Sequence, residues 1–192
     1  MTTGPNGGEV EMRRLILQMQ MSLDGFAGGP NGELNWIFPG FGSDAGGWIV
    51  DRLWQAGAHL MGGATYRDMA AHWPTSSEPA AAPMNQIPKL VLSRSLRDAP
   101  WGETRIVAGD VATEVARQKQ EPGRDLLAHG GVRFARSVIQ SGLIDEYRLI
   151  VHPVVLGRGL QPFSQIASPA RLALVDAVTF KTGVIAKTLR PA

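Results

Sequence analysis

Two pairs of neighbouring glycines stand where this chain could bind a phosphate group. Gly62–Gly63 is followed by Thr65, and Gly130–Gly131 is followed by Val132; each pair leads into a stretch with helical spacing. A glycine lets the backbone approach a phosphate closely, and the N–H groups and positive dipole end of the next helix attract it. Two such junctions in one sheet could hold the two ends of a dinucleotide. A double glycine is by itself a weak motif, because it also serves tight strand-to-helix turns.

The motifs of several other enzyme classes are absent. The sequence contains no G-x-G-x-x-G fingerprint, no G-x-x-x-x-G-K-[ST] phosphate loop and no G-x-S-x-G nucleophile elbow. Cysteine is absent, which excludes disulfides, thiol catalysis and thiolate metal sites. The four histidines are scattered without H-E-x-x-H spacing, so we expect no metal.

Length, composition and charge limit the classes of protein to which this chain could belong. With 192 residues, of which 44% are hydrophobic and 19% charged, the chain suits one globular domain. The 19 basic and 17 acidic side chains leave a net charge of +2, and no basic run stands out, so we expect no nucleic acid and no membrane as partners. Residues 1–12 are polar and Gly-rich and lack the pattern of a secretory signal. We therefore expect a flexible tail over 1–12, one domain over 13–190 and a cytoplasmic location.

Strand-like and helix-like patterns alternate along most of the chain. Strands are predicted at 13–21, 58–63, 89–93, 104–109, 125–131 and 145–156, helices at 47–57, 65–73, 111–120 and 132–142, and a final hairpin at 173–180 and 183–189. This order predicts an α/β fold: a mostly parallel twisted sheet with helices on both faces and an antiparallel C-terminal hairpin.

Single residues refine these elements. Thr65 and Asp110 are predicted to cap the helices that they precede. Pro153 within the strand at 145–156 suggests an edge or a bulge, and the polar, Pro-bearing stretch 75–87 is predicted to be a loop. Ligands of an open parallel sheet bind outside the carboxyl ends of its strands. This adds Ser93–Arg94, which follows the strand at 89–93, to the two glycine junctions.

Four segments together resemble the dihydrofolate reductase superfamily. They resemble most the branch that contains the reductase domain of the riboflavin-pathway pyrimidine deaminase/reductase. The segments are the S-x-D-G signature at 22–25, a G-R-x-T-Y-like stretch at 61–66, a K-x-V-x-S-R stretch at 89–94 and the long G-G…G-L-x-D-E…P-x-x-x-G-x-G…F pattern within 129–163. The resemblance covers roughly residues 13–190, and its last segment is the most specific.

The resemblance implies NADPH as the cofactor, a homodimer and a set of contact residues. In relatives of this kind the phosphates would meet Gly62 and Thr65, the pyrophosphate would face Gly130, Gly131 and Val132, and the adenosine 2′-phosphate would be held by Ser93 and Arg94. The loop from Ala27 to Trp36 would cover the nicotinamide, and its glycines suit a lid that moves. We also expect a cis peptide bond between Gly130 and Gly131, as is common in dihydrofolate reductases.

Two positions depart from the family pattern. Gly63 replaces the arginine of G-R-x-T, so one expected phosphate-binding cation is missing and the preference for NADPH over NADH depends on Arg94. His129 stands where the riboflavin-pathway reductases commonly have an acid before the double glycine. That acid is expected to help bind the ribose-like part of the substrate, so the histidine argues for a divergent reductase.

Hydride transfer to a C=N or C=O bond also requires a proton, and two residues are candidate catalytic groups. Asp24 follows the first strand at its carboxyl end, although Asp-Gly is also a common turn. His129 is a candidate proton donor, or a hydrogen-bonded residue at the end of a strand. For the substrate, Asp51 and Trp36 are candidate contacts, although a residue like the first is more often a solvated helix residue and one like the second more often a core or dimer contact.

Three functions remain open from the sequence. The first is an NADPH-dependent oxidoreductase that transfers hydride to a small heterocyclic or ribosyl-bearing substrate. The second is 5-amino-6-(5-phosphoribosylamino)uracil reductase of riboflavin biosynthesis. The third is a non-catalytic dinucleotide-binding homodimer.

Overall fold

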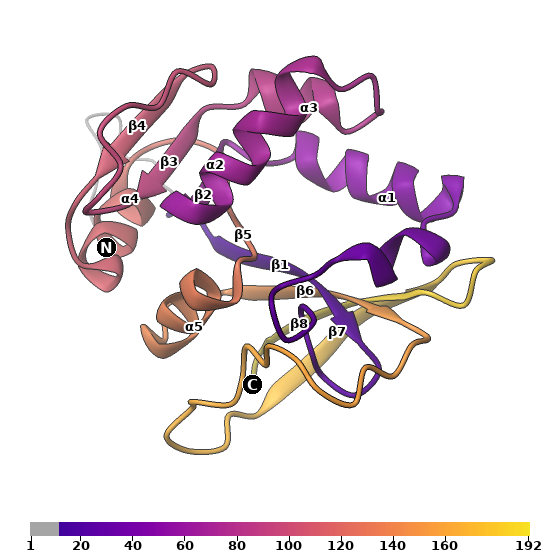
Figure 1. Cartoon of the computed structure of the whole chain (residues 1–192). Coiled ribbons are helices and arrows are strands. Elements are labelled where there is room, and N and C mark those ends of the chain that lie inside the picture. Colours follow the sequence, from indigo (N-terminus) through magenta and orange to yellow (C-terminus); the bar gives the residue numbers. More distant parts are fainter. Residues whose placement is uncertain (1–11) are drawn as a thin grey trace.

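A single mixed sheet forms the centre of the protein. The computed structural model describes residues 12–192 (Figure 1). Its strands are β1 (Leu15–Ser22), β2 (Ala58–Gly62), β3 (Lys89–Leu92), β4 (Thr104–Val107), β5 (Leu126–His129), β6 (Glu146–His152), β7 (Leu172–Thr179) and β8 (Ile185–Pro191). They lie in the order β4-β3-β2-β5-β1-β6-β8-β7. The first six are mutually parallel, and β8 and β7 add the antiparallel hairpin. The predicted fold class is confirmed.

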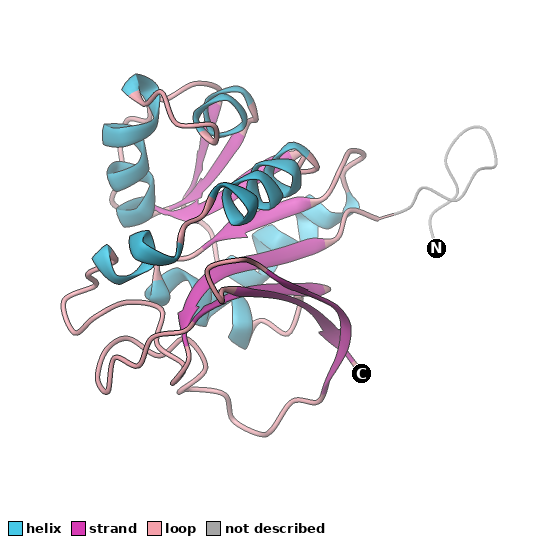
Figure 2. Cartoon of the chain, turned by 90° about the vertical axis from the view of Figure 1, so that its right-hand side faces the viewer, coloured by secondary structure: helices cyan, strands magenta, loops and turns pink. Residues whose placement is uncertain are grey.

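Helices cover both faces of this sheet (Figure 2). The α-helices are α1 (Ser43–Trp54), α2 (Gly63–His72), α3 (Ala81–Gln86), α4 (Val111–Gln120) and α5 (Val132–Gln140), with short 3-10 helices η1 (Asn35–Gly40) and η2 (Trp73–Thr75). The side chains of α1, α2 and α3 pack into the core on one face, and those of α4 and α5 pack on the other.

The sequence of β1 shows why the two faces differ. Leu15, Leu17 and Met19 alternate along the strand and are buried in the core beneath α5. Side chains of this size gain about 1.5–3 kcal/mol each on burial. On the other face, Ile16 is followed by Gln18, a polar residue that is also buried. The face under α1 therefore carries polar groups in the middle of the sheet.

Two predictions about local structure are wrong. The stretch 75–87 was expected to be a loop, but it contains α3. Pro83 is compatible with that helix because it occupies the first turn, where N–H groups have no intrahelical acceptor. The strand at 145–156 ends at His152, and Pro153 follows it instead of interrupting it. β6 is an interior strand, so a residue without an N–H donor ends its ladder.

The two predicted helix caps differ in outcome. Asp110 caps α4, since its side chain accepts from the backbone N–H of Thr113, and this prediction is confirmed. Thr65 does not cap α2, because the helix begins at Gly63 with Gly62 in the N-cap position. Its hydroxyl instead donates to the carbonyl oxygen of Gly130, 3.1 Å away.

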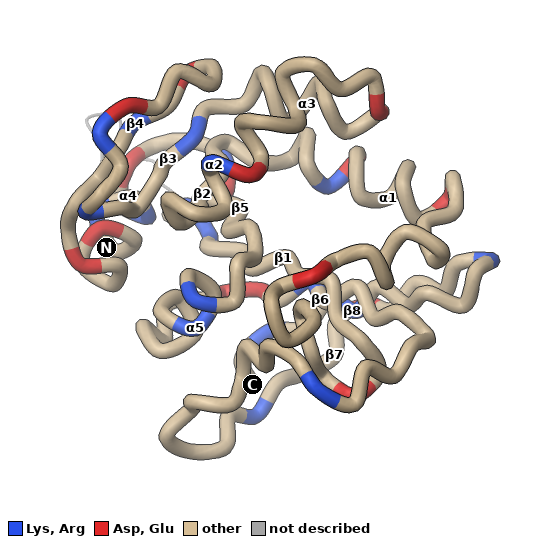
Figure 3. The backbone as a smooth tube through the Cα atoms, in the orientation of Figure 1, with Lys and Arg blue, Asp and Glu red and all other residues tan. Residues whose placement is uncertain are grey.

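Charges and termini complete the outline. Lys and Arg are interleaved with Asp and Glu along the chain (Figure 3). Among the described residues, no helix combines the length and apolarity needed to cross a membrane. The tail predicted over 1–12 lies outside the described residues except for Met12.

Candidate functional site

The starts of α2 and α5 lie side by side at the carboxyl edge of the parallel strands. The strands that lead into them, β2 and β5, are neighbours in the sheet. The hydrogen bond from Thr65 Oγ1 to Gly130 O connects the two junctions directly. Tertiary structure therefore brings together the two glycine pairs, which are separated by more than sixty residues in the sequence.

Neither helix start is closed by a side chain. The N-cap residues are Gly62 for α2 and Gly131 for α5, neither start has a side-chain cap hydrogen bond, and neither first turn contains an acid. Backbone N–H groups at such a start combine with the helix dipole to favour an anion. This is the arrangement that a pyrophosphate requires. Val132 is the buried first residue of α5, so its contribution there would come from the backbone.

The Gly130–Gly131 peptide bond is trans, which corrects the expected cis bond. The chain turns into α5 through Gly131, whose φ of +128° is open to glycine and strained for other residues. A methyl group at this position would also collide with Thr65 Oγ1. The sharp turn is thus made by a backbone dihedral and not by peptide isomerism.

Ser93 and Arg94 lie beside this edge, after β3. The Ser93 hydroxyl accepts from the backbone N–H groups of Ser95 and Leu96, at 3.3 and 3.0 Å. Arg94 is exposed and forms no hydrogen bond or ion pair within the described chain. A Cβ at Gly63 would lie 2.6 Å from Ser93 Oγ, so the serine occupies the space next to the position where the family arginine is missing.

Asp24 is hydrogen-bonded to the loop that follows β6. Its carboxylate accepts from Ser22 Oγ at 2.7 Å and from the backbone N–H groups of Leu156 and Gly157 at 3.1 and 2.7 Å. Desolvation opposes its ionisation, but these hydrogen bonds outweigh it and hold the pKa of Asp24 below its ordinary value. The structure thus gives Asp24 a clear role in joining two loops, and its contact with a substrate stays a prediction.

The loop predicted to cover the nicotinamide is anchored at its beginning. The N–H of Ala27 donates to the carbonyl oxygen of Leu160, and the N–H of Leu160 donates to the carbonyl oxygen of Gly28. Farther along, the indole N–H of Trp36 donates to the carbonyl oxygen of Glu33. The rings of Trp36 and His152 pack nearly perpendicular to each other, with their centroids 5.4 Å apart. Movement of a lid would therefore be confined to the part between these anchors.

His129 belongs to a buried histidine pair. Its Nε2 lies 2.8 Å from His59 Nδ1, and His59 Nε2 lies 3.3 Å from the carbonyl oxygen of Pro83. Since a carbonyl can only accept, His59 carries its proton on Nε2, and His129 must donate from Nε2 to the bare Nδ1 of His59. Burial lowers the pKa of His129 to about 4; burial, and then the neighbouring His129, hold the pKa of His59 well below its usual value.

This pair changes the role expected for His129. At neutral pH the ring is uncharged, its only N–H is committed to His59, and the remaining Nδ1 is a hydrogen-bond acceptor. The geometry thus argues against His129 as a proton donor at neutral pH.

Gln18 is a polar residue of the site that the sequence prediction missed. It lies beside His129 in the register of β1 and β5 and beside Arg148 in the register of β1 and β6. It is buried, and its Oε1 has no hydrogen-bond partner among the described residues. Gln20, two residues on, pairs with His152 at 2.7 Å. The signal was present in LILQMQM, where glutamines replace apolar residues on one face of a central strand.

Asp51 is not brought to this polar face. It is exposed on α1, whereas Ala45, Ile49 and Leu53 form the buried side of that helix. Within residues 12–192 no three His, Asp or Glu side chains form a cluster that could hold a metal ion. The residues brought together are those of the two helix starts, Ser93 with Arg94, and the polar groups of β1 and β5.

Comparison with known proteins shows the family and the fold of this chain. Residues 13–186 match the RibD C-terminal domain family. The uncharacterized protein YyaP of Bacillus subtilis (strain 168) is 30% identical over 181 residues, which cover 92% of this chain and 94% of YyaP.

Two solved structures share the fold. A protein of Shewanella sp. PV-4 named for riboflavin biosynthesis superposes with a TM-score of 0.72 at 20% identity, over 93% of this chain and 99% of that one. Dihydrofolate reductase from Enterococcus faecalis, solved with NADP(H), superposes with a TM-score of 0.62 at 14% identity, over 93% and 96%. Together with the family match, this fold supports a reductase role. The chain belongs to the RibD C-terminal domain family.

Proposed function

We propose that this protein is a reductase that transfers hydride from NADPH to a small molecule. The observation that supports the proposal most is the pair of adjacent helix starts, α2 and α5, that carry neither a side-chain cap nor an acid in the first turn. Both face the same edge and are joined through Thr65 and Gly130. An anion that bridges them would satisfy N–H groups that the protein leaves open.

The residues at this edge fit a dinucleotide phosphate. The backbone of Gly63 and Thr65 on one side and of Gly131 and Val132 on the other would bind the pyrophosphate. The guanidinium of Arg94, which has no partner in the described chain, would bind the adenosine 2′-phosphate next to the Ser93 hydroxyl. When bound, NADPH supplies the hydride, and the protein supplies binding, orientation and electrostatics.

The polar face under α1 would orient the substrate. Gln18 Oε1 and His129 Nδ1 both accept hydrogen bonds, so they suit N–H or O–H groups of the substrate. This fits a nitrogen heterocycle or a hydroxylated sugar better than an apolar ligand. Because His129 is neutral and its N–H is committed, we assign the proton that completes the reduction to water that enters the site.

The experiment that tests the proposal has two readouts. Quenching of tryptophan fluorescence by NADPH reports binding, and loss of absorbance at 340 nm over a substrate panel reports turnover. The panel includes the riboflavin-pathway aminopyrimidine. We expect NADPH binding in the micromolar range and steady oxidation with at least one panel member. Failure of both NADPH and NADH to bind at millimolar concentration would defeat the proposal, whereas binding without turnover would favour the non-catalytic dinucleotide binder.

We also propose that the chain forms a homodimer through the outer strand of the sheet. β7 is one of the two terminal strands of the sheet, and it exposes Leu174 and Val175 at 60% and 51%. Exposed apolar side chains on an edge strand favour pairing with a second strand. Light scattering on a sizing column measures the mass directly, and a monomer at micromolar concentration would contradict the dimer. The cytoplasmic location stays a prediction.

A further inference from the structure

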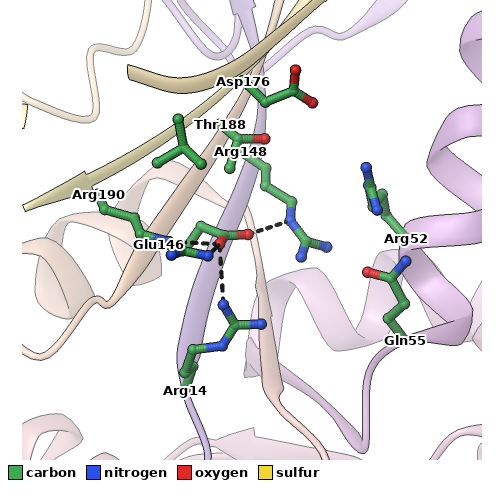
Figure 4. Close-up of a pocket in the computed structure, with 9 residues that line it drawn as sticks. Arg14, Arg52, Gln55, Glu146, Arg148, Asp176, Thr188 and Arg190 are labelled. Carbon is green, nitrogen blue, oxygen red and sulfur yellow. Dashed lines mark hydrogen bonds and ion pairs between the residues drawn. The ribbon is translucent and has the colours of Figure 1, made fainter. Parts of the chain in front are cut away.

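A pocket lined by arginines lies at the amino end of β6, away from the starts of α2 and α5. It has a volume of about 270 Å³ and lies between the end of α1 and strands β6, β8 and β7 (Figure 4). Its polar lining residues are Arg14, Arg52, Gln55, Glu146, Arg148, Asp176, Thr188 and Arg190. Four guanidinium groups in one pocket require counter-charges, so their partners decide what the pocket can bind.

Glu146 neutralises part of this charge. Its buried carboxylate accepts from Arg148 Nε at 2.8 Å, from Arg190 Nη2 at 2.9 Å and from Arg14 Nη1 at 3.4 Å. Desolvation raises the pKa of Glu146, but the hydrogen bonds from Arg190 and Arg148 outweigh it, so the net shift is downward and the group stays ionised. Arg14 is further paired with Asp125 at 2.6 Å. Three of the four arginines, Arg14, Arg148 and Arg190, thus donate to a carboxylate.

Arg148 and Arg52 remain without a full partner. Arg148 is only 5% exposed, and its one hydrogen bond within the described chain uses Nε. Its Nη groups point away from Glu146 toward Arg52 and Gln55 (Figure 4). Arg52 has no ion pair in the part of the chain that the structure describes; its guanidinium lies 5.1 Å from the centre of the Trp48 ring. Two cations therefore share one side of the pocket, and only Arg148 is paired with a carboxylate, through its Nε.

The local electrostatics disfavour this arrangement when the pocket is empty. Desolvation is the main cause of a lowered pKa for Arg148; the hydrogen bond and charge of Glu146 oppose it, and the positive charges of Arg52 and Arg14 add to it. A nearly buried guanidinium is costly unless its donors are satisfied. An anion between Arg148 and Arg52 would offset the repulsion between the two cations and accept hydrogen bonds from the Nη groups of Arg148.

We propose that this pocket binds a phosphate group, free or as a phosphate monoester, between Arg52 and Arg148. The planar donors of two guanidinium groups match phosphate oxygens, and the Gln55 amide adds a neutral donor at the rim. A phosphate monoester carries about −1.5 to −2 charges near neutral pH. This suits a pocket whose four guanidinium groups outnumber the carboxylates of Glu146, Asp125 and Asp176. Glu146 acts as a positioning residue, because its bond to Nε fixes the direction in which Arg148 presents its Nη groups.

This site is separate from the proposed cofactor site. Glu146 is the first residue of β6, at the amino end of the parallel strands, whereas Gly131 and Thr65 lie beyond the carboxyl ends of β5 and β2. The two sites also use different chemistry, since one offers backbone N–H groups and the other offers side-chain cations. The proposal therefore stands or falls independently of NADPH binding.

Calorimetric titration with inorganic phosphate tests the proposal, at pH 7.5 and at an ionic strength held constant with sodium chloride. We expect saturable binding by the wild-type protein and a dissociation constant raised about tenfold or more by Arg52→Gln, because a charge-assisted hydrogen bond is lost. Arg171→Gln removes the same charge from an exposed position outside the pocket and is the matched control. Arg171→Gln should bind inorganic phosphate as the wild type does. The titrations are repeated in the Arg94→Ala background, which removes the cation assigned to the cofactor phosphate, so that binding lost there on Arg52→Gln belongs to the arginine pocket.

Further titrations distinguish a phosphate monoester from free phosphate and from other anions. Ribose 5-phosphate in place of phosphate tests whether a monoester fits, and acetate tests whether any anion suffices. Gln55→Ala, a change at an exposed position, should weaken binding less than Arg52→Gln and serves if the latter variant does not fold. Equal binding by wild type, Arg52→Gln and Gln55→Ala would overturn the proposal, as would the absence of phosphate binding or an equal response to acetate.

Discussion

The start of α4 differs from the starts of α2 and α5, although all three helices follow parallel strands of the sheet. At α4, Asp110 accepts from the N–H of Thr113 at 3.0 Å and Glu114 adds a negative charge to the first turn. At α2 and α5, glycine occupies the N-cap position and no acid follows. Glycine in place of a capping side chain costs a helix only a few tenths of a kcal/mol. The junction after the outer strand β4 is therefore satisfied by the chain itself, and the two central junctions are left open to a ligand.

Replacing Gly131 should break the open start of α5 and has the largest expected effect. Gly131→Ala places a methyl group against Thr65 at a φ of +128°, so we expect a loss of about 1–3 kcal/mol in the free energy of unfolding and loss of NADPH binding. Urea denaturation and fluorescence titration measure the two effects.

The matched control is Gly142→Ala at the other end of α5. Gly142 also has a positive φ, +68°, but an added Cβ meets nothing within 4 Å. Gly142→Ala should lower the free energy of unfolding by about 1 kcal/mol, because alanine disfavours a left-handed backbone, and it should leave NADPH binding unchanged. If Gly131→Ala binds NADPH as well as Gly142→Ala does, the start of α5 is not the phosphate site.

An acid placed in the first turn of α2 would make that start resemble α4. Ala64 is exposed at the second position of the helix. We expect Ala64→Asp to stabilise the helix by about 0.3–1 kcal/mol through the dipole. The same charge should raise the dissociation constant for NADPH about tenfold, since it repels the pyrophosphate. Ala112→Asp, at the second position of α4, is the control, and an equal effect of both variants on NADPH affinity would contradict the comparison.

Arg94 should decide which nicotinamide cofactor is preferred. Arg94→Ala is expected to lower the ratio of kcat/KM for NADPH to that for NADH by about tenfold or more, because one charge-assisted contact with the 2′-phosphate is lost. Arg97→Ala, an exposed neighbour in the same loop, should leave the ratio unchanged. An unchanged ratio in Arg94→Ala would assign the 2′-phosphate to another residue.

Mild acid should destabilise the junction between β5 and α5 more than the junction between β4 and α4. His129 has a pKa of about 4 in the folded protein and about 6.5 in an unfolded chain, so the unfolded state binds more protons between these values. The free energy of unfolding should therefore fall as the pH drops from about 6.5 to about 4, by roughly 3 kcal/mol for this group.

Denaturant titrations at several pH values measure this loss. His129→Gln should reduce it, and His72→Gln, which removes an exposed imidazole paired with Glu78, is the control. Hydrogen bonds from Thr113 keep the pKa of Asp110 below its ordinary value, so the cap of α4 should survive this range. Identical pH dependence in wild type and His129→Gln would contradict the role given to the buried pair.

Local signals sufficed for most elements of the fold. Alternation in 13–21, helical spacing in 132–142 and the Asp110 cap each depend on residues close together in sequence, and the structure has β1, α5 and a capped α4 there. The α3 helix was missed because Pro83 reads as a helix breaker unless its place in the first turn is known. The roles of single residues were harder to predict, since Asp24 and Thr65 found partners more than sixty positions away.

By itself the sequence determined the order of strands and helices and the glycine junctions, because spacing and residue type act over a few neighbours. The resemblance to a known family predicts a phosphate site at those junctions. Only the tertiary structure decided which side chains are left without partners. His59 meets His129 across 70 residues, and Glu146 meets Arg14 and Arg190 from opposite ends of the chain. Such pairings determine protonation and charge balance, since they depend on which distant groups share a buried face.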